Sequence, residues 1–214
     1  MNGSAANEAT VGSNAMDQVA AALARHRPTL LHESLPRAAV LLALSDQGPM
    51  RMLLTRRASA LSSHAGQVAF PGGRRDPEDR HDEATALREA EEEVGLDPAR
   101  VRTLGRLSEV VSSNGLAVTP VVAGIAPDQN LRANPDEIAR IFHVPVLDLL
   151  AESPDHVHAL RRGTSTWYVP AWHWGGELIW GLTSMILVEF FNLAFEWDFD
   201  MRHAPDDIPV RPVP

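Results

Sequence analysis

The segment ALREAEEEVGL concentrates negative charge, because glutamate fills four of the five positions from Glu89 to Glu93. Its helix-forming residues predict a helix that begins near Asp82, an N-cap residue type, and stops at Gly95. Positions i, i+3 and i+4 share one face of a helix, so Glu89, Glu92 and Glu93 project together. Like charges at this spacing oppose a helix by about 0.2 to 0.5 kcal/mol per pair. This face therefore calls for a counter-charge or for strong solvation.

A divalent cation would reverse the repulsion between these carboxylates. Oxygen ligands without histidine or cysteine suit Mg²⁺ or Mn²⁺, which keep several waters and share their coordination shell with substrate phosphates. A solvated acidic helix face is the alternative, and the glutamate spacing alone favours it. The surrounding sequence has to decide between a metal site and a surface helix.

The sequence around the helix resembles a known hydrolase signature. A loop with the sequence FPGG precedes the helix, and the residues REAEEEVGL close it. This order resembles the Nudix hydrolase signature G-x5-E-x7-R-E-U-x-E-E-x-G-U, in which U is an aliphatic residue. The residues on its fixed positions are Arg88, Glu89, Glu92, Glu93 and Gly95.

The first half of the signature is altered in this chain. Gly73 stands fifteen residues before Arg88 rather than fourteen, and Arg80 takes the place of the first glutamate, with Asp79 as the nearest acid. The loop GGRRDPEDRHDEATALRE is nevertheless similar to GGxxDPxDxxxxxTALRE, a form found in the coenzyme A branch of the family. The departure thus points to a subfamily rather than to lost activity.

A second motif upstream supports the same branch. The stretch LLTRRASALSSHAGQVAFPGG resembles L-L-T-x-R-[S/A]-x3-R-x3-G-x3-F-P-G-G, apart from Ser62, which stands where an arginine is usual. If that arginine holds the coenzyme A moiety, Ser62 puts affinity or selectivity in doubt, unless Arg56, Arg57 or Arg75 takes its place. The two matches together cover about a fifth of the chain.

The resemblance implies both a fold and an activity. The fold is α+β, a Nudix-type α/β/α sandwich with a mixed β-sheet. The activity is hydrolysis of the pyrophosphate bond of coenzyme A or acyl-coenzyme A, which gives 3′,5′-ADP and 4′-phosphopantetheine or its acyl form. The implied cofactor is Mg²⁺ or Mn²⁺, and the implied partner is a small-molecule substrate.

The resemblance also assigns roles to charged residues. Glu89, Glu92 and Glu93 are expected to hold the metal, and Arg88 is expected to fix their rotamers by pairing with helix glutamates. The candidate catalytic residues are Glu92, Glu93 and Glu137, because the general base is either a helix glutamate or Glu137 in the segment NPDEIARIFHVPV. A cap at the entry to a helix or strand is an equal alternative for Glu137.

Substrate contacts are expected from Arg57, Gly72 and Gly73. The arginine supplies a guanidinium for phosphate, and the glycines permit a close backbone approach to the helix or the phosphates. A tight turn by itself also explains the two glycines. The tryptophans in TWYVPAWHWGGELIW are expected in the core or an interface, although they could stack on adenine.

Two other functions stay open. One is a Nudix pyrophosphatase for another nucleoside diphosphate derivative, such as ADP-ribose, and Ser62 is the residue that keeps this alternative open. The other is a nucleotide-binding module without turnover. The complete set of Glu89, Glu92 and Glu93 argues against such a module, because it need not retain every metal ligand.

Composition excludes several other partners and chemistries. The net charge of -9 and a pI near 5.4 leave no broad basic surface for nucleic acid or for an anionic membrane. All 19 cationic residues are arginine, so lysine chemistry is excluded and guanidinium groups have to bind phosphate. The absence of cysteine excludes disulfides and thiolate sites and agrees with the expected cytoplasmic location. A homodimer is compatible with the sequence.

The chain is predicted to form a single Nudix hydrolase domain at residues 16–200, between a disordered tail at 1–15 and a proline-rich tail at 201–214. The apolar run from Leu178 to Phe195 is interrupted by polar residues and glycine, so a buried helix is favoured over a membrane span. The other expected elements, in order, are a helix at 16–26, a hairpin of RAAVLLALSD and MRMLLTRR, a strand at QVAF, the glutamate helix, strands flanking SSNG, a strand at IARIFHVPV, a helix at LDLLAE and strands at VHALRRG and TWYVPAWHW.

Overall fold

The computed structural model describes residues 4–31, 34–45, 48–59 and 64–213. The helices are α1 (Ser4–Arg25), α2 (Asp82–Val94), the 3-10 turn η1 (Pro98–Arg100), α3 (Val146–Ala151) and α4 (Gly181–Phe195). The strands are β1 (Arg37–Ser45), β2 (Arg51–Arg57), β3 (Val68–Ala69), β4 (Gly72–Arg74), β5 (Val101–Arg106), β6 (Val110–Val111), β7 (Ala117–Ile125), β8 (Ile138–Pro145), β9 (His156–Arg162), β10 (Ser165–Trp174), β11 (Glu177–Ile179) and β12 (Val210–Arg211).

The central sheet is mixed, as the sequence predicts. Its strand order is β3-β2-β1-β7-β5, with β8 added to β2, β4 to β1 and β6 to β7. Strand β1 runs parallel to β7 but antiparallel to β2 and β4. Strand β2 pairs with β8 along its whole length but with β1 only at Arg51 and Met52, and its later residues Thr55 and Arg56 pair with β3. The FPGG turn, which joins β3 to β4, therefore lies between two branches of the sheet.

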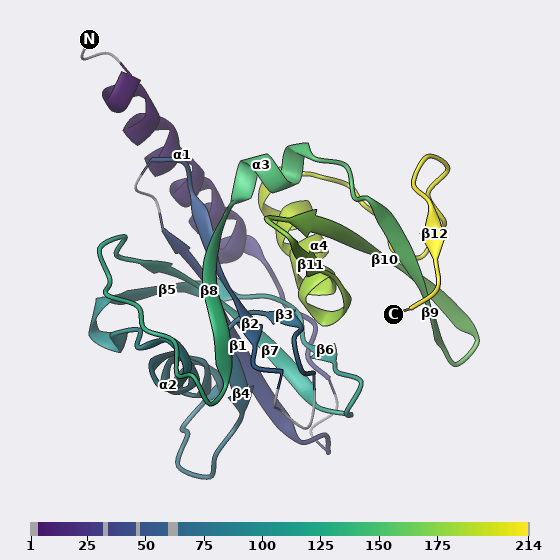
Figure 1. Ribbon diagram of the computed structural model, residues 1–214, viewed down its shortest axis with the longest axis horizontal. Coiled ribbons are helices and arrows are strands. Elements are labelled where there is room, and N and C mark those ends of the chain that lie inside the picture. Colours follow the sequence, from purple (N-terminus) through teal and green to yellow (C-terminus); the bar gives the residue numbers. More distant parts are fainter. Residues whose placement is uncertain (1–3, 32–33, 46–47, 60–63, 214) are drawn as a thin grey trace.

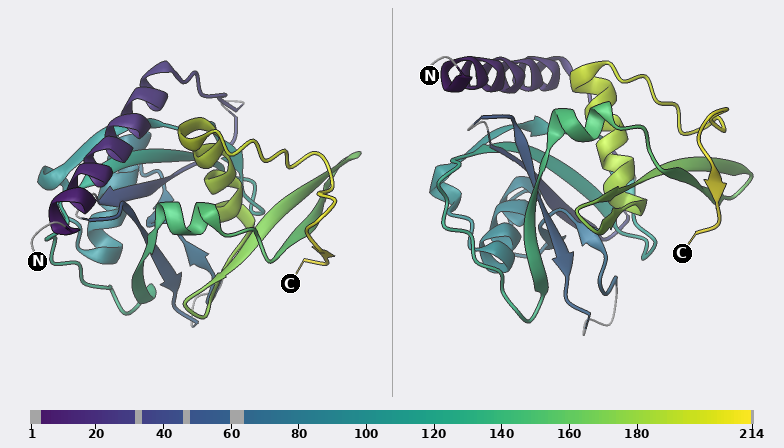
Figure 2. Two further views of the ribbon diagram at one scale, coloured as in Figure 1. Left: turned by 90° about the horizontal axis from the view of Figure 1, so that it is seen from above. Right: turned by 45° about the horizontal axis from the view of Figure 1, so that its top comes forward.

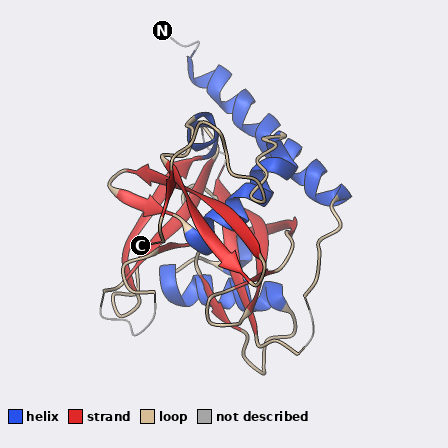
Figure 3. Ribbon diagram, turned by 90° about the vertical axis from the view of Figure 1, so that its right-hand side faces the viewer, coloured by secondary structure: helices blue, strands red, loops and turns tan. Residues whose placement is uncertain are grey.

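Helices cover both faces of the central sheet, which forms the expected α/β/α sandwich (Figures 1 and 2). Along β1, Leu41 and Ala43 belong to a core that includes α2 residues, whereas Leu42 and Leu44 belong to a second core that includes α1 and α4 residues. The alternation follows from the two-residue period of a strand. Figure 3 shows the strands lying between the helices on either side.

A second, four-stranded sheet has the order β11-β10-β9-β12 and extends to the right of the central sheet in Figure 1. Helix α4 contacts β10 and also β3 of the central sheet. The side chain of Thr183 in α4 donates to the carbonyl oxygen of Val68 in β3 at 2.9 Å. Helix α4 therefore joins the second sheet to the central one.

Both chain ends contain regular secondary structure outside the predicted domain limits. Helix α1 begins at Ser4 rather than at residue 16, in a segment that contains several alanines, the best helix formers. The proline-rich end also has structure, because Val210 and Arg211 form a parallel pair with Val157 and His158 of β9. This pairing depends on distant residues and leaves no local sequence pattern. Among the described helices, none is long and apolar enough to cross a membrane.

Candidate active site

Helix α2 presents the glutamates because its ends and its buried face are well defined. The imidazole of His81, rather than the expected Asp82, caps its first turn, and His81 Nδ1 accepts from the N–H of Ala84 at 3.2 Å. The Asp82 carboxylate is instead bound by arginines of β1 and of the loop. Gly95 ends the helix with a left-handed φ of 67°. The apolar side of α2 packs against the central sheet, so the glutamate side faces the FPGG turn.

Glu93 is the most buried glutamate of the helix, with 2% of its side chain exposed. Its carboxylate accepts from the backbone N–H of Gly72 at 3.0 Å and from Arg57 Nη1 at 3.2 Å. Burial raises the pKa of Glu93 to about 7, and the negative charges of Glu89 and Glu137 add to this effect. The surroundings of Glu93 therefore disfavour a negative charge on its carboxyl group in the absence of a cation.

Glu89 lies against the glycine turn, with 15% of its side chain exposed. A Cβ atom at Gly73 would stand 2.4 Å from Glu89 Oε2, so only glycine leaves room for this carboxylate. The neighbouring Gly72 has a φ of 153°, and a Cβ there would stand 2.3 Å from the Ala39 carbonyl oxygen. Burial raises the pKa of Glu89, although Arg88 opposes the shift. The two glycines thus shape the space around Glu89 and Glu93.

Arg88 ties the helix to the preceding loop. Its guanidinium contacts Glu89 and Glu92 at 3.1 Å each, which matches the pairing expected from the sequence. The same group donates to Asp79 at 3.0 and 3.2 Å, and Asp79 also accepts from the N–H of Asp76. The hydrogen bonds from Arg88 lower the pKa of Asp79 to about 2. Asp79 therefore occupies the position of an orienting acid that sequence reasoning noted but gave no role.

Glu137 reaches the same region from the start of β8. Its carbonyl oxygen accepts from the N–H of Ala58, which follows β2, at 2.8 Å. Burial is the main cause of the raised pKa of Glu89 and Glu93, and the negative charge of Glu137 is a smaller further cause for both. The fold thus brings Glu137 towards Glu89 and Glu93. Glu92 lies farther out, with 54% of its side chain exposed.

Comparison with known proteins agrees with this geometry. Residues 34–167, more than half of the chain, match the family model described as NUDIX domain. The chain belongs to the Nudix family. An uncharacterized Nudix hydrolase NudL from Photorhabdus laumondii is 44% identical over 160 residues, which cover 75% of this chain and 86% of that protein. An uncharacterized NudL from Yersinia pestis is 42% identical over 154 residues, or 71% of this chain and 76% of that one.

Solved Nudix structures resemble this protein over a smaller part of its chain. The Nudix hydrolase RenU of M. smegmatis aligns with a TM-score of 0.45 and 27% identity over 53% of this chain and 73% of its own. An Ap4A hydrolase of C. elegans aligns with a TM-score of 0.46 and 17% identity over 53% of this chain and 83% of its own.

The donor set of this Nudix protein fits a hard divalent cation. The chain offers carboxylate oxygens with mutual repulsion and a glycine turn that leaves room beside Glu89. As the side chains stand, no three histidine or acidic groups of the described residues form a closed ion site. Arg57, Arg88 and the N–H of Gly72 satisfy the carboxylates instead. Binding of a cation would therefore exchange these partners for metal bonds.

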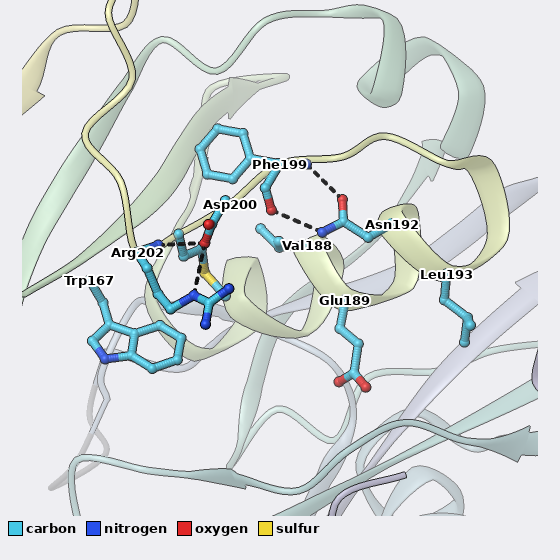
Figure 4. Close-up of a pocket in the computed structure, with 9 residues that line it drawn as sticks. Trp167, Val188, Glu189, Asn192, Leu193, Phe199, Asp200 and Arg202 are labelled. Carbon is cyan, nitrogen blue, oxygen red and sulfur yellow. Dashed lines mark hydrogen bonds and ion pairs between the residues drawn. The ribbon is translucent and has the colours of Figure 1, made fainter. Parts of the chain in front are cut away.

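Other residues singled out in the sequence lie elsewhere. Ser62 is outside the described residues. The predicted core position holds for Trp172, which is 1% exposed, while Trp167 lines a cavity of about 410 Å³ between α4 and the chain that follows it (Figure 4). In that cavity Asn192 binds the backbone of Phe199 and Asp200 binds Arg202, and none of the α2 glutamates is present. This cavity is separate from the candidate active site.

Proposed function

We propose that this Nudix hydrolase cleaves the pyrophosphate bond of coenzyme A or acyl-coenzyme A with the help of Mg²⁺ or Mn²⁺. One observation carries the proposal. The segment from Leu53 to Gly73, which resembles the coenzyme A branch, supplies two contacts to the α2 carboxylate of Glu93, through Arg57 and Gly72. The branch-specific segment and the general Nudix helix are therefore parts of one site.

Glu89, Glu92 and Glu93 would hold the cation in this reaction. A bound divalent cation neutralises pyrophosphate oxygens and lowers the pKa of a coordinated water. Arg88 keeps Glu89 and Glu92 in place through its anchorage on Asp79. These residues position the charge before the substrate arrives.

Glu137 is the candidate to accept the proton of the attacking water. Its carboxylate receives one long hydrogen bond from Asn134, at 3.5 Å, and no arginine pairs with it in the part of the chain that the structure describes. By contrast, Arg57 binds Glu93 and Arg88 binds Glu89. Glu137 is therefore the acid of this group that is least committed to a cationic partner. A helix glutamate, Glu92 or Glu93, stays the second candidate.

Arg57 is also a candidate for binding substrate phosphate. Its guanidinium is 22% exposed and binds Glu93, so substrate phosphate would compete with that carboxylate for the same donors. Binding of a cation by Glu93 would release Arg57 towards phosphate. Gly72 and Gly73 would then leave space for the substrate beside Glu89 and Glu93, since the two glycines already lie against these carboxylates.

The direct test is product analysis with a matched pair of variants. The purified protein is incubated with Mg²⁺ and either coenzyme A or ADP-ribose, and products are separated by chromatography. We expect 3′,5′-ADP from coenzyme A, and a loss of roughly 100-fold or more in the Glu93→Gln variant. Glu91→Gln removes the same charge from an exposed position of the same helix and is expected to retain activity.

Each other outcome has a defined meaning. Cleavage of ADP-ribose alone would favour the alternative nucleotide pyrophosphatase that Ser62 keeps open. Absence of turnover with both substrates would favour a nucleotide-binding module. Equal activity of Glu93→Gln and the unmodified protein would contradict the role of α2 as the metal site.

A further inference from the structure

Two arginines share one buried carboxylate at the end of the β2–β8 ladder. Arg56 of β2 and Arg140 of β8 are direct partners in the strand register. Arg140 Nη1 lies 2.9 Å from Glu177 Oε1, and Arg56 Nη1 lies 3.4 Å from the same oxygen. Glu177, on β11, has only 7% of its side chain exposed. The arrangement combines two positive groups with one negative group.

This cluster retains an excess positive charge that faces solvent. The side chains of Arg56 and Arg140 are 44% and 48% exposed. No second carboxylate pairs with either guanidinium among the described residues, so the net charge of the cluster is about one positive unit by counting its three ionised groups. Arg140 is also held over the ring of Phe142, at 5.5 Å from the centroid. A preorganised pair of guanidinium forks suits a phosphate group.

The cluster lies at the same end of the ladder as the candidate active site. Arg57, next to Arg56, contacts Glu93, and Glu137 precedes Arg140 by three residues. At about 3.3 Å per strand residue, this separation is roughly 10 Å along the chain. Arg56 and Arg57 flank a register shift in the ladder and have different neighbours, because Arg56 binds Glu177 on the β11 side and Arg57 binds Glu93 on the α2 side.

The FPGG turn links the two sides. Strand β3 leads into this turn. The carbonyl oxygen of Val68 in β3 accepts from Thr183 of α4, and β3 contacts β11, which carries Glu177. Four residues later, the N–H of Gly72 binds Glu93 on the side of α2. A ligand that rounds the end of the ladder beside this turn would meet both the glutamates and the arginine pair.

The sequence analysis offered Arg56, Arg57 and Arg75 as replacements for the arginine that Ser62 displaces, and the last two have different partners. Arg57 binds Glu93. Arg75 donates to the carbonyl oxygens of Asp79 and Arg80 and contacts Asp82. Arg56 is thus the member of that group that combines exposure with an arginine neighbour and a single shared carboxylate.

We propose that Arg56 and Arg140 bind a phosphate monoester of the substrate that is distinct from its pyrophosphate. This inference rests on the proposed function, under which the group is the 3′-phosphate of coenzyme A. It assigns to the pair the discrimination between nucleotides with and without that phosphate. Glu177 holds the two guanidiniums in place and leaves their remaining donors for the ligand.

The test compares two ligands that differ only in the 3′-phosphate. Calorimetric titration with 3′,5′-ADP and with 5′-AMP gives the ratio of their affinities. We expect the unmodified protein to favour 3′,5′-ADP, and Arg56→Gln and Arg140→Gln to lower the ratio by roughly ten-fold each without weakening 5′-AMP. Arg51→Gln, at the exposed opposite end of β2, is the matched control and is expected to keep the ratio. Thermal melts confirm that each variant is folded at the titration temperature.

Titration requires no turnover, so the inference and the proposed function can fail separately. A preference for 3′,5′-ADP that both variants lose supports the arginine pair even if coenzyme A is not cleaved. Should a glutamine variant be unfolded, the lysine variant at the same position keeps the charge but not the fork and is expected to lower the ratio as well. An unmodified protein without preference, or variants that retain it, would overturn the proposal.

Discussion

Asp79 illustrates how an acid beside the altered position of the signature binds Arg88. Arg80 takes the place of the first glutamate when the signature is counted back from Arg88, and the loop is one residue longer. The buried Asp79 carboxylate nevertheless receives two hydrogen bonds from the Arg88 guanidinium. The loop, one residue longer than in the signature, therefore brings an aspartate rather than a glutamate to Arg88.

We expect Asp79→Asn to destabilise the protein by about 2 kcal/mol at neutral pH, the range for hydrogen bonds to charged groups. The folded-state pKa of Asp79, about 2, lies below its ordinary value of 3.8. The stabilisation by the carboxylate is therefore complete above pH 3.8 and is lost as the pH falls through about 2. The free energy of unfolding, measured with denaturant from pH 7 to pH 2, is expected to be lower for the variant than for the unmodified protein. The difference is expected to shrink only at the acid end of this range.

Asp76→Asn is the matched control, because Asp76 lies 3.7 Å from Arg88 and is 57% exposed. Its stability is expected to change little. An Asp79→Asn variant as stable as this control at pH 7 would contradict the anchoring role of Asp79.

Gly73 offers a separate prediction about space. In Gly73→Ala the added methyl group would displace the Glu89 carboxylate, since the two would stand 2.4 Å apart. We expect a higher Mg²⁺ concentration for half-maximal activity and a lower maximal rate, measured in a magnesium titration. Gly124→Ala is the control, because a Cβ there meets its nearest atom, Met16 Sδ, at an ordinary 3.8 Å. Equal magnesium dependence of the two variants would contradict the prediction.

At the scale of elements, a pair of buried histidines connects β9 to the chain end. His156 and His158 are each 3% exposed, and their Nε2 atoms lie 3.1 Å apart. His158 Nδ1 lies 2.8 Å from the Pro212 carbonyl oxygen, so this nitrogen has to carry the proton. His158 Nε2 is then an acceptor and His156 Nε2 its donor. A proton added to His156 would find no acceptor on His158, so the contact between the two rings depends on a neutral His156.

We expect this contact to weaken at acid pH. Burial lowers the pKa of His156. The neighbouring His158 and Arg211 lower it further and His173 does so to a smaller extent, whereas Asp155 opposes the shift. A lowered histidine pKa means that stability is complete above the ordinary value of 6.5 and falls as the pH drops through the folded-state value. The protection factors of the β9 amides, which are exchange rates corrected for the intrinsic pH dependence of amide exchange, are expected to fall between pH 7 and pH 5.

A His156→Gln variant removes the titrating ring and is expected to lose this pH dependence. His203→Gln is the control, because His203 is 81% exposed, and it is expected to behave like the unmodified protein. Protection factors at β9 that do not change with pH in the unmodified protein would contradict the prediction.

For the whole molecule, the two chain ends are expected to differ in importance. The described buried residues of α1 begin at Ala15, so deletion of residues 1–12 keeps them. Deletion of residues 201–214 removes β12 and the acceptors of Tyr168 N–H, on Met201, and of the fully buried Val157 N–H, on Pro209. We expect the second deletion to lower the melting temperature by roughly 5 to 10 °C and the first to lower it much less.

Calorimetry of the two truncated proteins checks this expectation. Equal melting temperatures would support the domain limits proposed from the sequence, residues 16–200. A larger loss from the C-terminal deletion would extend the folded unit to the end of the chain. The buried N–H of Val157 and the half-buried N–H of Tyr168, which would lose their acceptors, are the physical reason for expecting the second result.

The sequence by itself determined the features that depend on neighbours along the chain. The spacing of Glu89, Glu92 and Glu93 and the stop at Gly95 predicted α2 and its glutamate face. The Nudix resemblance predicted the mixed sandwich and the proposed metal role of that face. Helix periodicity and the φ preference of glycine act over a few residues, so they can be read locally.

Only the tertiary structure decided which distant groups meet. It placed Arg57 and Gly72 on Glu93, brought Glu137 towards Glu89, anchored Arg88 on Asp79 and paired β12 with β9. It also exchanged Asp82 for His81 as the cap of α2, because arginines elsewhere in the fold take the Asp82 carboxylate. Hydrogen bonds and ion pairs between remote segments require the folded backbone to bring their atoms within about 3 Å, and no short sequence pattern encodes that distance.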